Sequence, residues 1–154
     1  MSTTTPLADI CNFREVDSTL LTSGQPTEAQ LSSIARSGVE VVINLAPHDL
    51  PSALQDEPGA VRALGMDYVH IPVPFSAPAE ADLAAFFAAM RANRNRKTLV
   101  HCAANKRVTA FLGLYRVLEL GWPAEAAFAP MHSVWEPDAT WSRFIAAMLE
   151  RHGE

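Results

Sequence analysis

Cysteine is scarce in this 154-residue chain, and its two cysteines, Cys11 and Cys102, lie far apart in the sequence. A disulfide framework like that of small secreted domains is therefore not expected, and free thiols in a cytoplasmic protein are the better interpretation. We expect Cys11 to be a plain buried thiol. The chain has no C-x-x-C pair, and the neighbours His101 and Cys102 cannot easily face one ion together, so no metal site is expected.

The chain also lacks a net positive charge and long apolar runs. The net charge is -5, so the chain has no basic footprint for nucleic acid or for an acidic membrane surface. No stretch approaches the ~18 uncharged apolar residues of a transmembrane helix. The N-terminus MSTTTPLADI lacks the basic start and apolar core of a secretory signal. Any bound anion must therefore be held by a local site.

No internal repeat or low-complexity linker divides the chain, so we expect one domain over residues 1–154, with residues 1–10 as a poorly ordered tail. The β-branched run VEVVINL (39–45) predicts a central strand that is buried on both faces. Further strands are expected within 13–24, over 67–73 and over 97–102. Helices are predicted after a capping box at Thr27, before Gly65, around 83–90, over 108–120, near 124–132 and from Asp138.

This alternation of strands and helices predicts an α/β fold with a central, largely parallel sheet flanked by helices. Ligands of such sheets bind beyond the carboxyl ends of the strands. Cys102 falls at such an end, in the stretch LVHCAANKRVTAF (99–111).

The turn after Cys102 has the features of an anion-binding loop. A strand-to-helix turn aims successive backbone N–H groups at one point, and the helix N-terminus adds about half a positive charge. Ala103 and Ala104 are small enough to let an anion approach the backbone, and Asn105 tolerates a positive φ. Arg107 can close on the anion with a bidentate fork. Lys106 adds positive potential or points to solvent.

The same field stabilises a thiolate. Cysteines at helix N-termini or beside cations titrate at roughly 3.5–7.5 instead of about 8.5. We therefore expect Cys102 to be ionised at neutral pH and to lie under the anion. Its sulfur would attack phosphorus in line and give a phosphocysteine that water hydrolyses. The alternative is a small buried thiol at a strand end, the usual role of a lone cysteine.

The pattern H-C-x4-R-V-x-A-F after an apolar strand resembles the cysteine-dependent protein tyrosine and dual-specificity phosphatases. More narrowly, it is similar to a bacterial branch of them, the beta-lactamase-hydrolase-like phosphatases. The segments NFREVDSTLLTSGQPTEAQL (12–31), VVINLAP (41–47) and DYVHIPV (67–73) agree with this, as do GW and VWEP near 121–137. The resemblance therefore spans most of the chain.

The resemblance implies a single-domain protein tyrosine phosphatase-like fold with no cofactor, and a phosphorylated protein or small molecule as substrate. Cys102 is then the nucleophile, Arg107 binds phosphate, and His101 orients the loop and tunes the thiolate. Thr109 resembles the hydroxyl residue that hydrogen-bonds the thiolate. Phosphate, sulfate and vanadate are expected as ligands of the loop.

The loop departs from the commonest phosphatase signature, because four residues instead of five separate Cys102 from Arg107 and Val108 follows the arginine. A four-residue gap also occurs in the bacterial branch. Rhodanese-type sulfurtransferases likewise have a shorter loop, so sulfur transfer through a persulfide on Cys102 is a second hypothesis. A non-catalytic phosphate-binding module is a third.

The general acid is not evident from the sequence. Related phosphatases place an aspartate in the loop after the strand that corresponds to 67–73, and here that loop has none before Ala79. Glu80 and Asp82 are the nearest carboxylates, and Asp49 follows another strand end. If none serves, aryl esters such as phosphotyrosine are the expected substrates, because their leaving group needs less help. Gln25, in the SGQP turn, is a further candidate for contact with the ligand.

Overall fold

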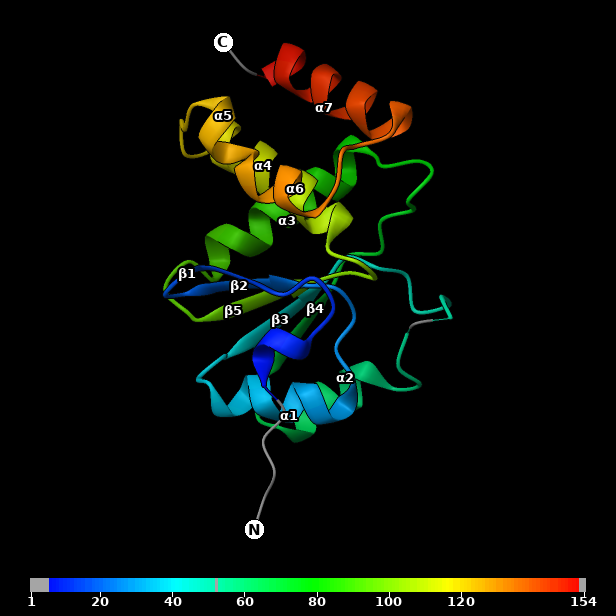
Figure 1. Ribbon diagram of the computed structural model, residues 1–154, viewed down its shortest axis with the longest axis vertical. Coiled ribbons are helices and arrows are strands. Elements are labelled where there is room, and N and C mark those ends of the chain that lie inside the picture. Colours follow the sequence, from blue (N-terminus) through cyan, green and yellow to red (C-terminus); the bar gives the residue numbers. More distant parts are fainter. Residues whose placement is uncertain (1–5, 52, 153–154) are drawn as a thin grey trace.

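The computed structural model describes residues 6–51 and 53–152, which build a five-stranded sheet with helices on both faces (Figure 1). The strand order is β1-β2-β5-β3-β4, and only the β1–β2 pair is antiparallel. The expected α/β fold with a largely parallel sheet is thus confirmed. The strands are β1 (Arg14–Asp17), β2 (Leu20–Ser23), β3 (Val41–Asn44), β4 (Asp67–His70) and β5 (Thr98–His101).

The central strands are apolar because both of their faces are covered. Every residue of β3 and β5 is buried. Successive side chains of a strand point to opposite faces: Val41 and Ile43 join one core cluster, whereas Val42 joins the other. The continuous apolar run therefore serves two cores.

The helices lie in two layers (Figure 1). Helices α1 and α2, with the short 3-10 helix η1, cover one face, and α3 to α7 cover the other. The predicted capping box is present, because the Thr27 side chain accepts from Gln30 N and the Gln30 side chain accepts from Thr27 N. The helices are η1 (Leu7–Asp9), α1 (Glu28–Arg36), α2 (Glu57–Ala63), α3 (Glu80–Ala92), α4 (Lys106–Leu118), α5 (Ala124–Ala127), α6 (Ala129–Val134) and α7 (Ala139–His152).

Two elements differ clearly from expectation. The strand expected over 67–73 ends at His70, although Ile71 N still donates to Asn44 O and Val73 N to Leu45 O, both at 2.9 Å. The helix expected near 124–132 is divided into α5 and α6, and Pro130 stands in the first turn of α6, where its missing N–H is tolerated.

The N-terminal part of the chain also differs from expectation. Cys11 is exposed and forms no disulfide, so the prediction of a buried thiol was wrong. Within the tail expected over residues 1–10, residues 1–5 lie outside the described part, whereas Leu7–Asp9 form η1 and Ile10 is buried.

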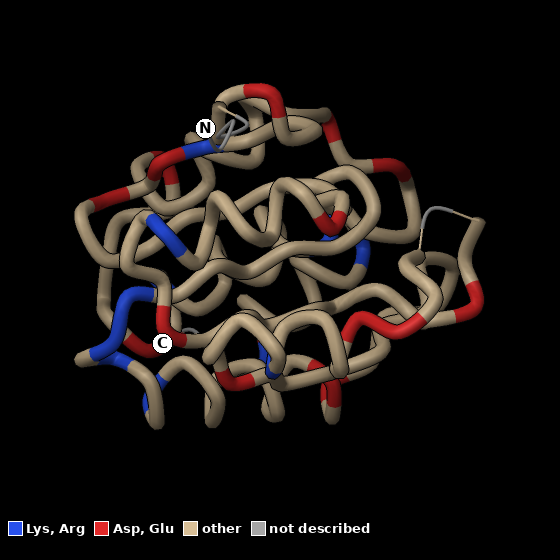
Figure 2. The backbone as a smooth tube through the Cα atoms, turned by 90° about the horizontal axis from the view of Figure 1, so that it is seen from below, with Lys and Arg blue, Asp and Glu red and all other residues tan. Residues whose placement is uncertain are grey.

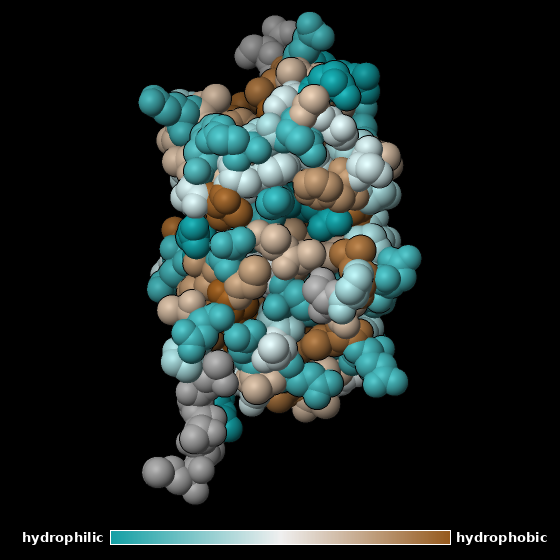
Figure 3. All heavy atoms as spheres, turned by 45° about the vertical axis from the view of Figure 1, so that its right-hand side comes forward, coloured by the Kyte–Doolittle hydropathy of each residue, from teal (hydrophilic) through white to brown (hydrophobic). Residues whose placement is uncertain are grey.

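The surface is mixed in polarity and charge. Figure 2 shows acidic and basic residues at many separate places along the described backbone. Apolar residues form separate patches between hydrophilic ones on the face shown in Figure 3. Within residues 6–51 and 53–152, no helix combines the length and the apolar character needed to span a bilayer.

Candidate active site

Residues 102–107, named the anion loop below, connect the end of β5 to the start of α4. Cys102 and Asn105 have no exposed surface. Asn105 adopts the left-handed conformation, with φ +66°, as its position in the turn predicted. Its side-chain amide donates to Asn12 O at 2.9 Å and to Thr22 Oγ1 at 3.1 Å. These bonds hold the turn against the segments that carry Asn12 and Thr22.

Neighbouring segments hold the carbonyl groups of the anion loop. Gln25 N donates to Ala103 O at 3.0 Å, and Asn12 Nδ2 donates to Ala104 O at 3.0 Å. The close approach requires glycine at position 24, because a Cβ there would lie 2.6 Å from Ala103 O. Among residues 6–51 and 53–152, no hydrogen bond from the amide N–H of Ala103 or Ala104 is seen, whereas the backbone around Ala104 pairs with Gly24 in an isolated β-bridge. Such donors at the start of a helix form an anion cradle.

Arg107 is anchored so that part of its guanidinium stays available. Its side chain is almost buried, its Nε donates to Val73 O at 2.8 Å, and its guanidinium carbon lies 5.1 Å from the centroid of the Phe75 ring. The two terminal nitrogens donate to no other residue in the described part of the chain. They can form the bidentate contact that suits a phosphate.

A cavity of about 460 Å³ opens above the anion loop. Lys106, on its rim, holds its ammonium 5.5 Å from the centroid of the Trp135 ring. The lining is apolar apart from Lys106 and Arg107, and consists of Leu50, Pro51, Phe75, Ala103, Ala104 and the two basic residues. The structure thus brings Ala103, Ala104 and Arg107 of the anion loop to one cavity, and Cys102, buried, directly precedes them in the chain.

His101 has a partner that sequence reasoning missed. Its Nε2 lies 2.5 Å from Oε2 of Glu57, and its Nδ1 lies 3.3 Å from Cys102 O. Both side chains are almost completely buried. The sequence gives no signal that separates Glu57 from other acidic residues at helix starts, because acids are common there for dipole reasons alone.

Burial raises the pKa of the Glu57 carboxyl, but hydrogen bonds and charges oppose this. The hydrogen bond and charge of His101, together with the hydrogen bond from Gln25, outweigh burial and bring the pKa below its usual range. Glu57 is therefore a carboxylate. Gln25 Nε2 donates to Glu57 Oε1 at 2.9 Å. The Gln25 side chain therefore binds Glu57, and it is the Gln25 backbone N–H that supports the anion loop.

The Thr109 hydroxyl forms its hydrogen bonds with backbone carbonyl groups at the start of α4. It donates to Asn105 O at 2.8 Å and lies 3.1 Å from Lys106 O. No hydrogen bond joins it to Cys102 in the described part of the chain. The hydroxyl closes the first turn of the helix, which differs from the thiolate contact that the resemblance implied.

Two of the three candidate acids are engaged elsewhere. Glu80 pairs with Arg151 and with His152 Nε2, the latter at 2.7 Å, and so ties α3 to α7. Asp82 accepts from Ala79 N at 3.2 Å and caps α3. Neither lines the cavity above the anion loop.

Asp49 is placed differently. It is exposed, and within residues 6–51 and 53–152 no hydrogen bond or ion pair involves it. It directly precedes Leu50 and Pro51, which form one wall of the cavity. Asp49 is thus the candidate acid that lies beside the cavity and has no structural use.

The loop that carries Asp49 is fixed to β4 by a stack of rings. The His48 and His70 rings are parallel, with centroids 3.7 Å apart. His48 Nε2 lies 2.8 Å from the Tyr68 hydroxyl, and His70 Nε2 lies 2.6 Å from Ala46 O. Within the described ranges, no group of three histidine, cysteine or acidic side chains is arranged to hold a metal ion.

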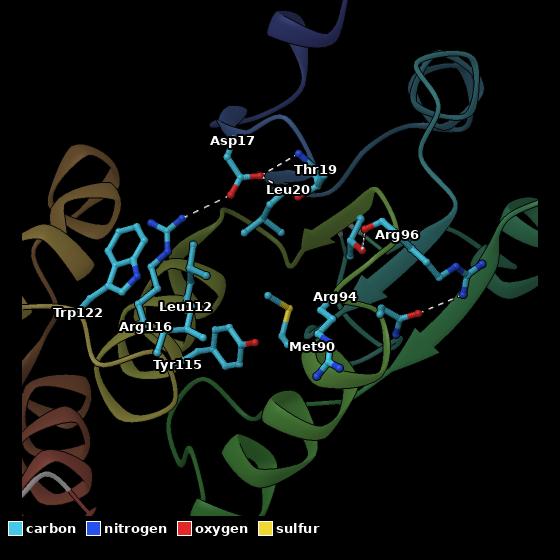
Figure 4. A pocket seen from close by; sticks show the side chains of 13 residues that line it. Asp17, Thr19, Leu20, Met90, Arg94, Arg96, Leu112, Tyr115, Arg116 and Trp122 are labelled. Carbon is cyan, nitrogen blue, oxygen red and sulfur yellow. Dashed lines mark hydrogen bonds and ion pairs between the residues drawn. The ribbon is translucent and has the colours of Figure 1, made fainter.

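A second cavity, of about 190 Å³, lies at the opposite end of the sheet, beside Leu20 and Thr98 at the starts of β2 and β5 (Figure 4). Its arginines do not converge: Arg116 is directed toward Asp17, 3.9 Å away, and Arg94 points away from it. Arg116 also stacks on Trp122, with 4.1 Å between its guanidinium carbon and the ring centroid. This cavity lacks the convergent donors of a phosphate site.

Comparison with known proteins places these features in a family. Residues 12–118 match the model of a family described as "Beta-lactamase hydrolase-like protein, phosphatase-like domain". The chain is 32% identical over 108 residues to the beta-lactamase hydrolase-like protein of Xylella fastidiosa. That match covers 68% of this chain but only 25% of the relative, so the chain spans about a quarter of the length of the curated relatives it matches.

Solved structures share the whole fold. A Shewanella putrefaciens protein described as a candidate phosphatase superposes with a TM-score of 0.85 at 36% identity, covering 96% of this chain and 97% of that one. A variant of TpbA from P. aeruginosa, crystallised in complex with pTyr, gives a TM-score of 0.66 at 18% identity, covering 94% and 93%. At that identity the second likeness concerns the fold alone.

Proposed function

Because the chain belongs to the family of phosphatase-like domains of beta-lactamase hydrolase-like proteins, we propose that it hydrolyses phosphate monoesters with Cys102 as its nucleophile. One observation carries the proposal: the only described cysteine that lies at a strand-to-helix turn is followed by free amide donors and by an anchored arginine. These groups suit the charge of a phosphoryl oxygen, and Cys102, which directly precedes them in the chain, is buried.

The chemistry proceeds in two displacements. Arg107 and the amides of the anion loop bind the phosphoryl oxygens, and the Cys102 thiolate attacks phosphorus. The S–P bond forms as the P–O bond to the leaving group breaks, and the departing oxygen takes a proton from an acid. Water then attacks the phosphocysteine, its proton passes to the same carboxylate, and phosphate leaves with the thiolate restored.

Asp49 is our candidate for this acid. Asp82 and Glu80 are committed to a helix cap and to ion pairs. Glu57 is buried on the α2 side, where its lowered pKa keeps it ionised, so it has no proton to give. Asp49 stands next to the Leu50–Pro51 wall and has no competing partner.

The substrate proposed is a single phosphate on an aromatic or otherwise apolar carrier, such as phosphotyrosine. Three residues support this: Leu50, Pro51 and Phe75 give the cavity apolar walls that suit a ring. Beyond Arg107, Lys106 is the sole basic residue of the lining, which offers little to a carrier with many phosphates. TpbA, which shares this fold, was crystallised in complex with pTyr, and this supports the proposal.

Turnover of p-nitrophenyl phosphate by the wild type and by Cys102→Ser tests the proposal. We expect turnover by the wild type, inhibition by vanadate, and loss of turnover in Cys102→Ser. A parallel assay follows thiocyanate formation from thiosulfate and cyanide. Thiocyanate without phosphatase turnover would replace the proposal with sulfur transfer, and turnover by Cys102→Ser would remove Cys102 from the mechanism.

A further inference from the structure

The contact between Glu57 and His101 places a carboxylate and an imidazole together out of water. The exposed fractions of the two side chains are 1% and 0%. A carboxylate buried to this extent needs a charged or strongly donating partner, because desolvation otherwise drives it to the neutral form. Its contacts with His101 and Gln25 supply such partners.

Both ring nitrogens of His101 face acceptors. One faces the carboxylate of Glu57 and the other faces the carbonyl of Cys102. A neutral imidazole has only one N–H group, so it can satisfy only one of these contacts. The contact with Glu57 is the shorter of the two, so the carboxylate has the stronger hold on the ring, one residue before Cys102.

We propose that Glu57 is a positioning residue of the active site: its carboxylate holds the His101 ring in place at Nε2, and His101, whose Nδ1 faces the Cys102 carbonyl, thereby fixes the Cys102 backbone and favours the thiolate. The inference rests on the proposed role of Cys102 as nucleophile. Glu57 does not line the cavity above the anion loop, so it acts through His101 and does not touch the substrate.

Glu57 also joins segments that are distant in sequence. It begins α2, it contacts His101 at the end of β5, and it accepts from Gln25 after β2. The Gln25 backbone in turn donates to Ala103 O. A single carboxylate therefore ties both sides of the anion loop to α2.

Other titratable groups face this pair. His48, from the loop after β3, lowers the pKa of Glu57 through its charge. His70, on β4, is influenced by the charges of His48, Glu57 and His101. A pH profile must therefore be compared between variants that leave these histidines unchanged.

Glu57→Gln tests the inference, with Glu28→Gln as the matched control. Each glutamate is the first residue of its helix, but Glu28 is exposed. The full chain is assayed with p-nitrophenyl phosphate, and alkylation of Cys102 by iodoacetamide is followed across pH by peptide mass. We expect Glu57→Gln to lower kcat by about tenfold or more with a smaller change in KM, and to move the alkylation midpoint of Cys102 to higher pH.

The control is expected to leave both measurements unchanged. Equal kcat and equal alkylation profiles for the two variants would overturn the inference, even if Glu57→Gln lowers stability. If Glu57→Gln does not fold, Glu57→Asp is used, which keeps a carboxylate but shortens its reach to His101. A lower kcat together with an alkylation midpoint at higher pH supports the inference, and a kcat and midpoint equal to those of Glu28→Gln overturn it. Turnover that survives in Cys102→Ser would instead contradict the proposed function.

Discussion

At the scale of single residues, a carboxylate can act as a general acid only if no structural hydrogen bond or ion pair already uses it, and Asp49 meets this condition in the described part of the chain. Acids at helix starts are often consumed by the helix itself, as Asp82 is by the Ala79 amide. Asp49 lies in a loop held by ring contacts of His48 and His70, which fix its backbone without using its carboxylate. A positioned carboxylate of this kind can deliver a proton to a leaving oxygen.

Asp49→Asn should therefore act according to the leaving group. A general acid contributes about 100-fold or more where the leaving oxygen is basic, and less where it is already a good leaving group. We expect kcat/KM to fall by about 100-fold for phenyl phosphate and clearly less for p-nitrophenyl phosphate. Asp82→Asn, measured beside it, should keep nearly wild-type kcat/KM for both esters. Equal losses for the two esters in Asp49→Asn would contradict an acid role.

Asn105 shows a second residue-level constraint, that of backbone conformation. Glycine and alanine at this position both lose the bonds to Asn12 O and Thr22 Oγ1, but only glycine adopts a φ of +66° without strain. Asn105→Ala should be less stable than Asn105→Gly by about 1 kcal/mol. Urea unfolding of the two variants measures the difference, and an alanine variant as stable as the glycine variant would contradict it.

At the level of elements, helix α7 supports the cavity above the anion loop although it lies beyond the matched residues 12–118. Trp141 has no exposed surface, and its Nε1 donates to Phe75 O at 2.8 Å. The Phe75 ring packs against Trp141 with 5.7 Å between centroids, and it also carries the Arg107 guanidinium. The C-terminal helix thus sets the position of a cavity wall.

Trp141→Phe removes this hydrogen bond and retains most of the apolar contact. Leaving Phe75 O without its partner should cost about 1–3 kcal/mol of stability, and we expect a severalfold rise in KM for p-nitrophenyl phosphate because the Phe75 wall moves. Trp122→Phe, at an exposed position outside the cavity above the anion loop, serves as the control. Unchanged KM in a destabilised Trp141→Phe would limit α7 to a structural role.

The elements were largely predictable because periodicity and caps are local properties. The anion loop was predictable for the same reason, since Cys102, Asn105 and Arg107 lie within six consecutive residues. The partner of His101 was not predictable. Glu57 and Glu80 both begin helices, yet one pairs with a buried histidine and the other with the exposed end of α7. Only the tertiary placement of α2, which brings Glu57 to the end of β5, decides between these uses.

For the molecule as a whole, acid weakens two contacts on the α2 side of the sheet at different pH values. Burial lowers the pKa of His70 below 6.5; the Ala46 carbonyl opposes this, and the charge of His48 adds to it. The folded protein therefore binds fewer protons at His70 than the unfolded chain does, and stability falls as the pH drops below about 6.5. The lowered pKa of Glu57 has the same sign, but its contribution is lost only as the pH drops below about 4.5.

These windows predict acid destabilisation in two stages that separate variants resolve. His70→Phe retains a ring against His48 but cannot be protonated, so its free energy of unfolding should change less than that of the wild type between pH 7.5 and about pH 5.5. Glu57→Gln should keep this first stage and lose part of the second, which Glu80 shares because its pKa is also lowered by His152 and Arg151. Urea unfolding at three pH values measures both stages. If the free energy of unfolding of His70→Phe changes with pH as much as that of the wild type, protonation of His70 does not cause the first stage. That stage would then come from other titratable groups.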